Sequence, residues 1–421
     1  MTAGQRFYLP RIADGELIAR LRRSGAVLIE GPKGCGKTET GRQLAASEVQ
    51  VDIDPSVATL MAIDPTLVLD GSVPRLLDEW QAQPALWNVV RHAVDERQEK
   101  GQFILTGSAH PVEDAQMHSG AGRISRLRMR PMSLWESGFS SGEVSLGALL
   151  DGHPPMTVNK EPALETIIDL VVRGGWPGNH DASLADARSQ MQDYVDLLVE
   201  VDVSRVSDRR RDPIRVRQLL RAVARSVGTE ASVATLTRDV AGQSEPLAWE
   251  TVTDYLDVLT RLMVLDDVPA WSSHLRSSAT LRKSPKRHFV DPALAVAALG
   301  GGPDQLVRDL EFTGQLFESL VMRDLRVYSQ PHGAQVVHAR DSYGNEADAI
   351  VQRRDGGWLA VEVKLGPGAV DAAAASLHRF VQGVDATRSG ECVGKVVITG
   401  WGVAHRRADG VMVVPLTVLR A

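Results

Sequence analysis

The sequence has very little cysteine and no long apolar run. Only Cys35 and Cys392 occur among its 421 residues, which excludes a secreted disulfide framework and agrees with a reducing compartment. The first twenty residues carry scattered charges and lack an apolar core, so they do not resemble a secretory signal. No apolar stretch approaches the roughly 18 to 20 residues that span a bilayer. We therefore expect a cytoplasmic protein that does not contact a membrane.

Lysine is also scarce, and the net charge is modest. Eight of the 47 basic residues are lysine, so Lys37 and Lys364 occupy positions that need an explanation. The formal charge of −6 gives no general reason to expect a nucleic-acid partner. The segment from Arg205 to Arg225 departs from this average, with eight arginines against two aspartates. Because arginine binds phosphate oxygens, we predict that this segment binds nucleic acid; a solvated helix face is the alternative.

The length and the order of apolar segments predict three domains. A chain of 421 residues is long enough for two to four domains. Short apolar strands alternate with helical stretches in the first part of the chain, which is typical of a parallel sheet covered on both faces. A mostly helical region follows, and strands return after it. We predict an α/β domain at 1–150, a helical domain at 151–300 and a second α/β domain at 301–421, with a linker or exposed connection at 138–155.

Residues 31–38 match the pattern G-x-x-x-x-G-K-[ST] between a predicted strand and a predicted helix. Glycines let the backbone amides turn around phosphate oxygens, and the helix N-terminus adds its dipole. Lys37 would reach the β and γ phosphates, and the Thr38 hydroxyl would bind Mg²⁺. The motif therefore predicts binding of a nucleoside triphosphate with Mg²⁺. The residues expected to form the site are Gly31, Pro32, Lys33, Gly34, Cys35, Gly36, Lys37 and Thr38.

Two acidic residues follow the next apolar pair along the chain. A nucleotide hydrolase needs one carboxylate for the magnesium shell and usually a second acid for the attacking water. We predict that Asp78 supports the metal and that Glu79 is the base. Thr106 and Ser108, at the end of the predicted strand at 103–105, are expected to orient the attacking water or to sense the γ phosphate; a polar cap at the strand end is the alternative.

Residues 17–137 resemble the prokaryotic AAA-type ATPases. The resemblance rests on the Asp-Glu-x-Gln motif at 78–81, the Leu-Thr-Gly-Ser strand at 105–108, and shorter matches at 122–123, 131–136 and 174–177. It implies a P-loop ATPase fold that uses ATP, joined to a C-terminal region of unknown function.

The same resemblance implies an oligomer. In AAA-type rings an arginine near the strand after the sensor strand reaches the γ phosphate of the neighbouring subunit, and Arg123 has the matching place. We therefore predict that Arg123 acts in trans in a homo-oligomer. Alternation along the following strand points Arg126, Arg128 and Arg130 to one face, where a solvated or nucleic-acid-facing stripe is the other interpretation.

The apolar spacing at 212–265 is consistent with a small winged-helix-like unit, a class that often binds duplex DNA.

The C-terminal region brings paired carboxylates together. Asp348 lies in one predicted strand, while Glu362 and Lys364 share a face of the next, so a hairpin would set Asp348 beside Glu362. Paired carboxylates suit a hard divalent cation, and a lysine could orient the attacking water. The pattern resembles the PD-(D/E)XK nuclease superfamily, with Glu318 on the preceding helix matching an auxiliary acid that helps to hold the metal. Structural ion pairing with Lys364 is the alternative.

These observations lead to one main hypothesis. We expect an ATPase that couples nucleotide turnover to a Mg²⁺-dependent, nuclease-like domain acting on DNA or RNA. The alternative is an ATP-operated switch in signalling, stress or defence, whose C-terminal domain recognises a partner and cuts nothing. A nucleic-acid-binding regulator with slow ATP turnover is a third candidate.

Overall fold

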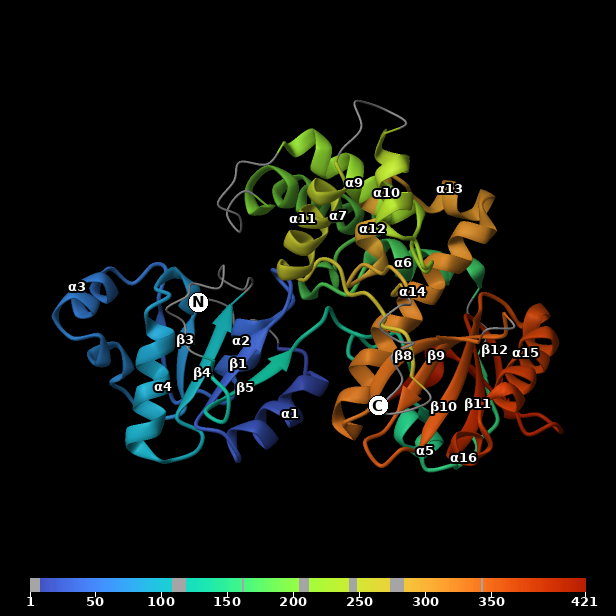
Figure 1. The fold of residues 1–421 in the computed structure, drawn as a ribbon, viewed down its shortest axis with the longest axis horizontal. Coiled ribbons are helices and arrows are strands. Elements are labelled where there is room, and N and C mark those ends of the chain that lie inside the picture. Colours follow the sequence, from blue (N-terminus) through green and yellow to red (C-terminus); the bar gives the residue numbers. More distant parts are fainter. Residues whose placement is uncertain are drawn as a thin grey trace.

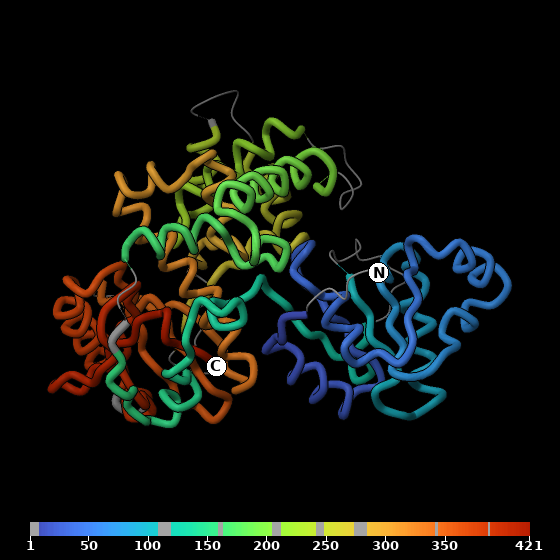
Figure 2. Tube along the Cα trace, turned by 180° about the vertical axis from the view of Figure 1, so that it is seen from behind, coloured from blue at the N-terminus to red at the C-terminus, as the bar shows by residue number. Residues whose placement is uncertain are grey.

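The computed structural model describes residues 8–107, 119–160, 163–203, 212–241, 248–272, 284–341 and 344–421. Three lobes make up the molecule: an N-terminal α/β lobe in blue, a helical lobe in green and yellow, and a C-terminal α/β lobe in orange and red (Figure 1). Figure 2 shows the same arrangement from behind, with residues near 130–150 running alongside the C-terminal lobe. Among the described helices, none is both long and apolar enough to cross a membrane.

The sheet of the N-terminal lobe is parallel and has the order β2-β3-β4-β1-β5 within the described chain. Its central strands are apolar and buried, as expected for strands covered on both faces. Because parallel strands end at one edge, the residues after β1, β3 and β4 meet there. The strands are β1 (Ala26–Glu30), β2 (Ser47–Gln50), β3 (Arg75–Asp78), β4 (Phe103–Gly107) and β5 (Ile124–Arg128).

Four helices flank this sheet. In the longest, α4, the residues that recur at helical spacing are buried, among them Leu86, Val90 and Val94. In α3, Pro55 occupies the first turn and the Asp54 side chain accepts a hydrogen bond from the Ser56 amide, which explains where the helix begins. The helices are α1 (Ile12–Leu21), α2 (Lys37–Arg42), α3 (Pro55–Ile63) and α4 (Leu86–Arg97).

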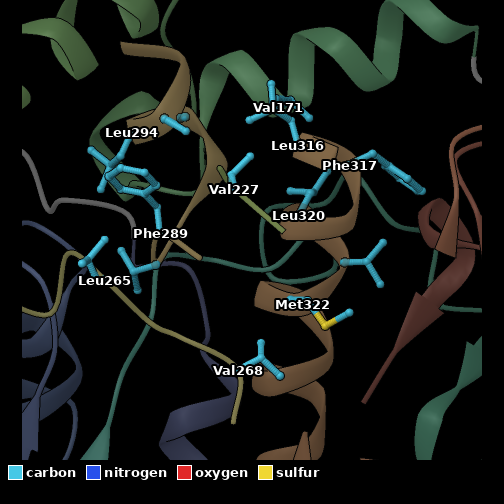
Figure 3. Packing of buried hydrophobic residues seen from close by; sticks show 14 of the residues in the cluster. Val171, Val227, Leu265, Val268, Phe289, Leu294, Leu316, Phe317, Leu320 and Met322 are labelled. Atoms are coloured by element: carbon cyan, nitrogen blue, oxygen red, sulfur yellow. The ribbon is translucent and has the colours of Figure 1, made fainter. Parts of the chain in front are cut away.

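The helical lobe packs around a shared apolar core that extends onto α14 (Leu310–Ser329) of the next lobe. Figure 3 shows Leu316 and Leu320 of α14 close to Val171 and Val227 of the helical lobe. After α11 the chain forms two isolated antiparallel bridges, Leu265 with Phe289 and Val268 with Lys286. The helices include α6 (Leu164–Arg173), α7 (Leu184–Leu197), α9 (Pro213–Arg225), α10 (Val233–Ala241), α11 (Trp249–Arg261), α12 (Pro292–Leu299) and α13 (Pro303–Arg308).

The C-terminal lobe is built on a mixed sheet with the order β7-β12-β13-β11-β10-β9-β8 in the described residues. Two helices cover opposite faces: Leu359 and Val361 of β10 share a core with α14, while Trp358 and Ala360 pack with α15. The elements are β8 (Gln335–Arg340), β9 (Glu346–Gln352), β10 (Trp358–Lys364), α15 (Val370–Gly383), α16 (Ala386–Ser389), β11 (Cys392–Thr399), β12 (Gly402–Arg406), β13 (Met412–Pro415) and β14 (Leu419–Arg420).

The predicted linker at 138–155 is wrong. The segment holds β6 (Val144–Ser145), which pairs with β14 at the end of the chain, and α5 (Leu146–Leu150), which buries its leucines. Just after it, β7 (Val158–Lys160) pairs with β12. The glycine, serine and proline content of the segment predicts only local turns. It does not show that the leucines of α5 pack against β10 and β11, which lie far along the sequence. The stretch is therefore part of the C-terminal lobe.

Candidate functional site

The phosphate loop (residues 31–38) joins β1 to α2 at the carboxyl edge of the parallel sheet. Gly34 and Gly36 have φ values of 71° and 103°, in the left-handed region where glycine is strongly preferred. The buried Lys37 ammonium donates hydrogen bonds to the carbonyls of Gly31 at 3.0 Å and Pro32 at 2.9 Å. The Lys37 side chain therefore folds back over its own loop. When a nucleotide binds, the ammonium can leave these two carbonyl oxygens and donate to phosphate oxygens instead.

Asp78, at the end of β3, collects two hydroxyl groups. Thr38 Oγ1 donates to Asp78 Oδ1 at 2.7 Å, and the Thr106 hydroxyl on β4 donates to the same oxygen. A threonine hydroxyl beside a carboxylate is a donor set that suits Mg²⁺ in a phosphate-binding site. Thr38 and Asp78 therefore fit the predicted metal. The structure brings these three predicted residues together, and Ser108 lies outside the described residues.

Glu79 follows directly and is held in an unusual conformation. Its φ is 50°, and the Gln81 amide donates a hydrogen bond to its carboxylate. Burial raises the pKa of Glu79, against the opposing charge of Lys37. A carboxylate with a raised pKa is a stronger proton acceptor, which agrees with the predicted role as base.

The helical lobe holds the phosphate loop from outside the sheet. Trp176 Nε1 donates to the Lys33 carbonyl at 2.9 Å, and the Lys33 ammonium forms an ion pair with Asp202. A Cβ atom on Gly34 would lie 3.3 Å from the Trp176 ring. From sequence, residues 174–177 were only a landmark of the family resemblance, and their contact with the loop could not be predicted.

Arg11 is a second residue that holds the loop, and sequence reasoning missed it. Its buried guanidinium donates to the Cys35 carbonyl at 2.7 Å and to the Arg130 carbonyl at 2.8 Å. Its Nε lies 3.1 Å from Glu136 Oε1, in an ion pair with both side chains buried. Glu136 also accepts from the Ser133 amide at 2.8 Å. The only sequence signal was Glu136 in the 131–136 landmark.

Buried charges continue from this point to α14. The Leu134 amide donates to Asp324 Oδ2 at 3.0 Å, and Asp324 pairs with Arg323. Arg323 pairs in turn with Asp291 at 2.7 Å, and Asp291 accepts from the Gly175 amide at 2.9 Å. The network joins the loop's Arg11 anchor, α14 and the segment that carries Trp176.

Arg123 lies at the amino-terminal ends of the parallel strands, opposite to the phosphate loop at their carboxyl ends. Its carbonyl accepts from the Ala26 amide at the start of β1, whereas the phosphate loop follows the end of that strand. The exposed guanidinium pairs with Asp95 at 2.8 Å. Arg123 therefore cannot reach the phosphates of its own chain, and its action on a neighbouring chain stays a prediction.

The solvated stripe expected after Arg123 is wrong for two of its three arginines. Arg128 and Arg130 form ion pairs with Asp266 of the helical lobe, at 3.0 and 2.6 Å. Arg326 of α14 joins them at 2.7 Å. Although burial opposes ionisation of Asp266, these arginines hold its pKa well below the usual range. Arg126 is exposed. Arg128, Arg130 and Arg326 therefore meet at Asp266, where the three lobes contact one another.

The predicted basic segment is described only from residue 212 onward. Three of its arginines form ion pairs: Arg215 with Asp212, Arg217 with Asp196 and Arg225 with Asp239. Residues 205–211 lie outside the described chain. Nucleic-acid binding by this segment stays a prediction.

The C-terminal carboxylates meet as the hairpin predicts. The β9 and β10 strands pair antiparallel, with Val361 opposite Ala349, and the Val363 amide donates to Asp348 Oδ2 at 2.8 Å. Lys364 Nζ lies 2.8 Å from Glu362 Oε1 and 4.0 Å from Asp348 Oδ2. Asp348, Glu362 and Lys364 therefore converge.

A second lysine lies at this cluster and was not predicted. Lys286 Nζ is 2.9 Å from Glu318 Oε1, 2.9 Å from Glu346 Oε1 and 3.2 Å from Asp348 Oδ1. Burial, followed by the charge of Asp348, raises the pKa of Glu318 to about 8 and that of Glu362 to about 7. Among the residues that the structure describes, no group of three or more His, Cys, Asp or Glu side chains is arranged to hold a metal.

Comparison with known proteins agrees with the fold of the first lobe. Residues 23–137 match a family described as AAA domain, so the chain carries an AAA-type P-loop ATPase domain. Residues 164–305 and 313–419 match two families, each described as a domain of unknown function (DUF8612 and DUF4143). The predicted ATPase resemblance is confirmed, and the nuclease resemblance stays a prediction.

Relatives that match more than one domain of the chain are also found. Two uncharacterized proteins, of Mycobacterium bovis and Mycobacterium tuberculosis, are each 26% identical over 328 residues, covering 76% of this chain and 67% of their own. Among solved structures, a Walker-type ATPase of Pyrococcus abyssi is 13% identical with a TM-score of 0.43, covering 68% of this chain and 94% of its own. None of the three names states a cellular role.

Proposed function

We propose that the protein is a Mg²⁺-dependent ATPase whose nucleotide site controls the helical and C-terminal lobes. The main support for this proposal is that two residues outside the sheet bind the phosphate loop. Trp176 donates a hydrogen bond to the Lys33 carbonyl, and Arg11 donates one to the Cys35 carbonyl. A loop that rearranges around phosphate must pull on both contacts.

The roles at the site follow from the contacts. Lys37 releases the Gly31 and Pro32 carbonyls and binds phosphate oxygens. Thr38 and Asp78 would hold Mg²⁺, which would neutralise charge on the phosphates. Glu79 takes the proton of the attacking water, and Thr106 keeps the Asp78 carboxylate oriented.

ATP hydrolysis by the full chain tests the assignment. We expect Lys37→Ala to abolish hydrolysis, and Glu79→Gln to bind ATP while hydrolysing it at least about a hundredfold more slowly. Lys100→Ala, which changes an exposed lysine of the same lobe, is the matched control. Hydrolysis by Lys37→Ala at the wild-type rate would refute the proposal.

A second candidate function, metal-dependent cleavage of a phosphodiester, draws support from the C-terminal lobe. Asp348, Glu362 and Lys364 converge on the adjacent strands β9 and β10. The test is Mn²⁺- or Mg²⁺-dependent cleavage of labelled DNA and RNA, with and without ATP, that disappears in Glu362→Ala. Absence of cleavage favours the ATP-operated switch with a recognition module.

The support for nucleic-acid binding comes from the helical lobe. Three helices, α9 to α11, followed by two bridged segments support the winged-helix-like interpretation. Phosphate contacts would make binding strongly salt-dependent. We expect charge reversal at 209–211 to weaken binding of duplex DNA and to reduce its dependence on salt, measured by fluorescence anisotropy. Binding unchanged by the reversal would exclude this segment as the contact surface.

A further inference from the structure

The carboxylate cluster (Glu318, Glu346, Asp348 and Glu362) is already occupied by a cation of the protein itself. The Lys286 ammonium lies within 3.2 Å of oxygens from three of the four side chains. Its side chain is only 4% exposed, so water does not share this position freely. The oxygens come from α14 and β9, two separate elements that converge on one nitrogen atom.

A divalent ion at this cluster would have to take the place of the Lys286 ammonium. Magnesium and calcium bind carboxylate oxygens at about 2.0 to 2.6 Å, so an ion between Glu318 and Asp348 would require the space of the Lys286 nitrogen. The ammonium and the ion also repel each other. The residues therefore do not fit a metal while Lys286 is in place.

Charge balance explains why the lysine is held there. Four carboxylates face two ammonium groups, Lys286 and Lys364, and buried unpaired carboxylates are costly. Burial alone would lower the pKa of Lys286, but Asp348, Glu318 and Glu346 outweigh it and raise that pKa. Lys286 thus stays charged, as a metal substitute must. One oxygen, Glu362 Oε2, remains buried without a partner among the described residues.

The lysine is delivered by a segment outside the C-terminal sheet. Lys286 and Val268 exchange two main-chain hydrogen bonds, of 2.9 and 3.0 Å. Two residues before Val268, Asp266 is fixed to Arg130 of the ATPase lobe and Arg326 of α14. The position of Lys286 is therefore set by the junction of the three lobes, not by the cluster alone.

We propose that Lys286 is a built-in cation that takes the metal position of the carboxylate cluster and keeps the C-terminal lobe free of divalent ions. In this conformation the carboxylate cluster does not support metal-dependent cleavage. The inference rests on the carboxylate cluster identified under the second candidate function, and it counts against cleavage there while Lys286 is in place. It is independent of ATP hydrolysis, so failure of one leaves the other testable.

Mn²⁺ binding to the nucleotide-free full chain, followed by electron paramagnetic resonance of the free ion, tests the proposal. We expect wild type and Asp348→Asn to bind Mn²⁺ equally. We expect Lys286→Met, which keeps the length of the side chain but not its charge, to gain one site per chain that is lost again in the Lys286→Met, Asp348→Asn double variant. Lys395→Met, at a lysine outside the cluster, is the matched control and should behave as wild type.

Two results would overturn the proposal. One is a Mn²⁺ site in wild type that Asp348→Asn removes, because the cluster would then accept a metal beside Lys286. The other is a folded Lys286→Met protein that gains no site. If circular dichroism shows that Lys286→Met does not fold, the comparison of wild type with Asp348→Asn decides alone, equal binding supporting the proposal.

Discussion

The indole nitrogen of Trp176 donates a hydrogen bond of 2.9 Å to the carbonyl of Lys33, which joins the helical lobe to the phosphate loop. The two residues come from different lobes and meet through one donor and one acceptor. If nucleotide binding changes the conformation of the loop, it also changes this hydrogen bond. Removing the Trp176–Lys33 hydrogen bond should therefore change the affinity for nucleotide.

Trp176→Phe removes this donor and keeps most of the ring. A typical hydrogen bond contributes about 1 kcal/mol, so we expect ATP affinity to change by roughly fivefold. The measurement is titration with a fluorescent ATP analogue. Trp249→Phe, at an exposed tryptophan on α11, is the control and should leave affinity unchanged. Equal affinity in wild type and Trp176→Phe would show that the bond does not influence the site.

Glu136→Ala should destabilise the chain strongly. It leaves the buried Arg11 guanidinium without its carboxylate, and breaking a buried pair costs about 3 to 5 kcal/mol. Urea unfolding followed by circular dichroism gives the value. Glu48→Ala breaks an exposed pair with Arg42 and should cost about 1 kcal/mol or less. A loss in Glu136→Ala no larger than the Glu48→Ala loss would count against the anchoring role of Arg11.

Arg123 should act only between chains. Its distance from its own loop means that Arg123→Ala keeps ATP binding, while the loss of a trans-acting arginine slows hydrolysis by about a thousandfold. Mixing Arg123→Ala with Lys37→Ala should restore hydrolysis, since the first supplies an intact loop and the second an intact arginine. Arg126→Ala serves as the control. A mixture as inactive as its parts would argue against a shared site.

His288 should make the folded chain sensitive to acid. Burial, reinforced by nearby Arg326 and Lys286, holds its pKa well below the usual range. The unfolded chain therefore binds a proton below about pH 6.5 that the folded chain does not, and stability falls as the pH drops. The loss is about 1.4 kcal/mol per pH unit for one proton. The groups around it are Arg326, Lys286, Asp266, His338 and Ser319.

His288→Asn keeps a polar group near the Ser319 hydroxyl but cannot take up the proton. We expect its unfolding free energy to fall less steeply than that of wild type between pH 6.5 and about pH 5. Urea unfolding at several pH values provides the slopes. Identical slopes would mean that another group controls the acid response.

Local patterns predicted which residues of each candidate site lie close together. The phosphate loop is continuous in sequence, and Asp78 and Thr106 lie at the carboxyl ends of neighbouring parallel strands, so their meeting at one edge was predictable. Asp348 and Glu362 met because a hairpin brings alternating positions together. In each case one supersecondary unit carries the whole geometry.

Contacts between lobes could not be predicted in this way. Lys286, Arg11 and Trp176 reach their partners across long sequence separations, and no periodicity marks them. Lysine scarcity was the available signal for Lys286, because only eight occur in the chain. The same limit explains the error at 138–155, where the partners of β6 and α5 lie mostly near the end of the sequence.

The pairing of β7 with β12 and of β6 with β14 also has a consequence during synthesis. These early strands leave the ribosome before the entire helical lobe, and their partners emerge last. The ATPase lobe has all its strands early and can fold while the rest is being made. The early strand edges of the C-terminal lobe must instead wait unpaired, and exposed strand edges invite aggregation. We therefore expect chains that end before residue 402 to be far more prone to aggregate than the 421-residue chain.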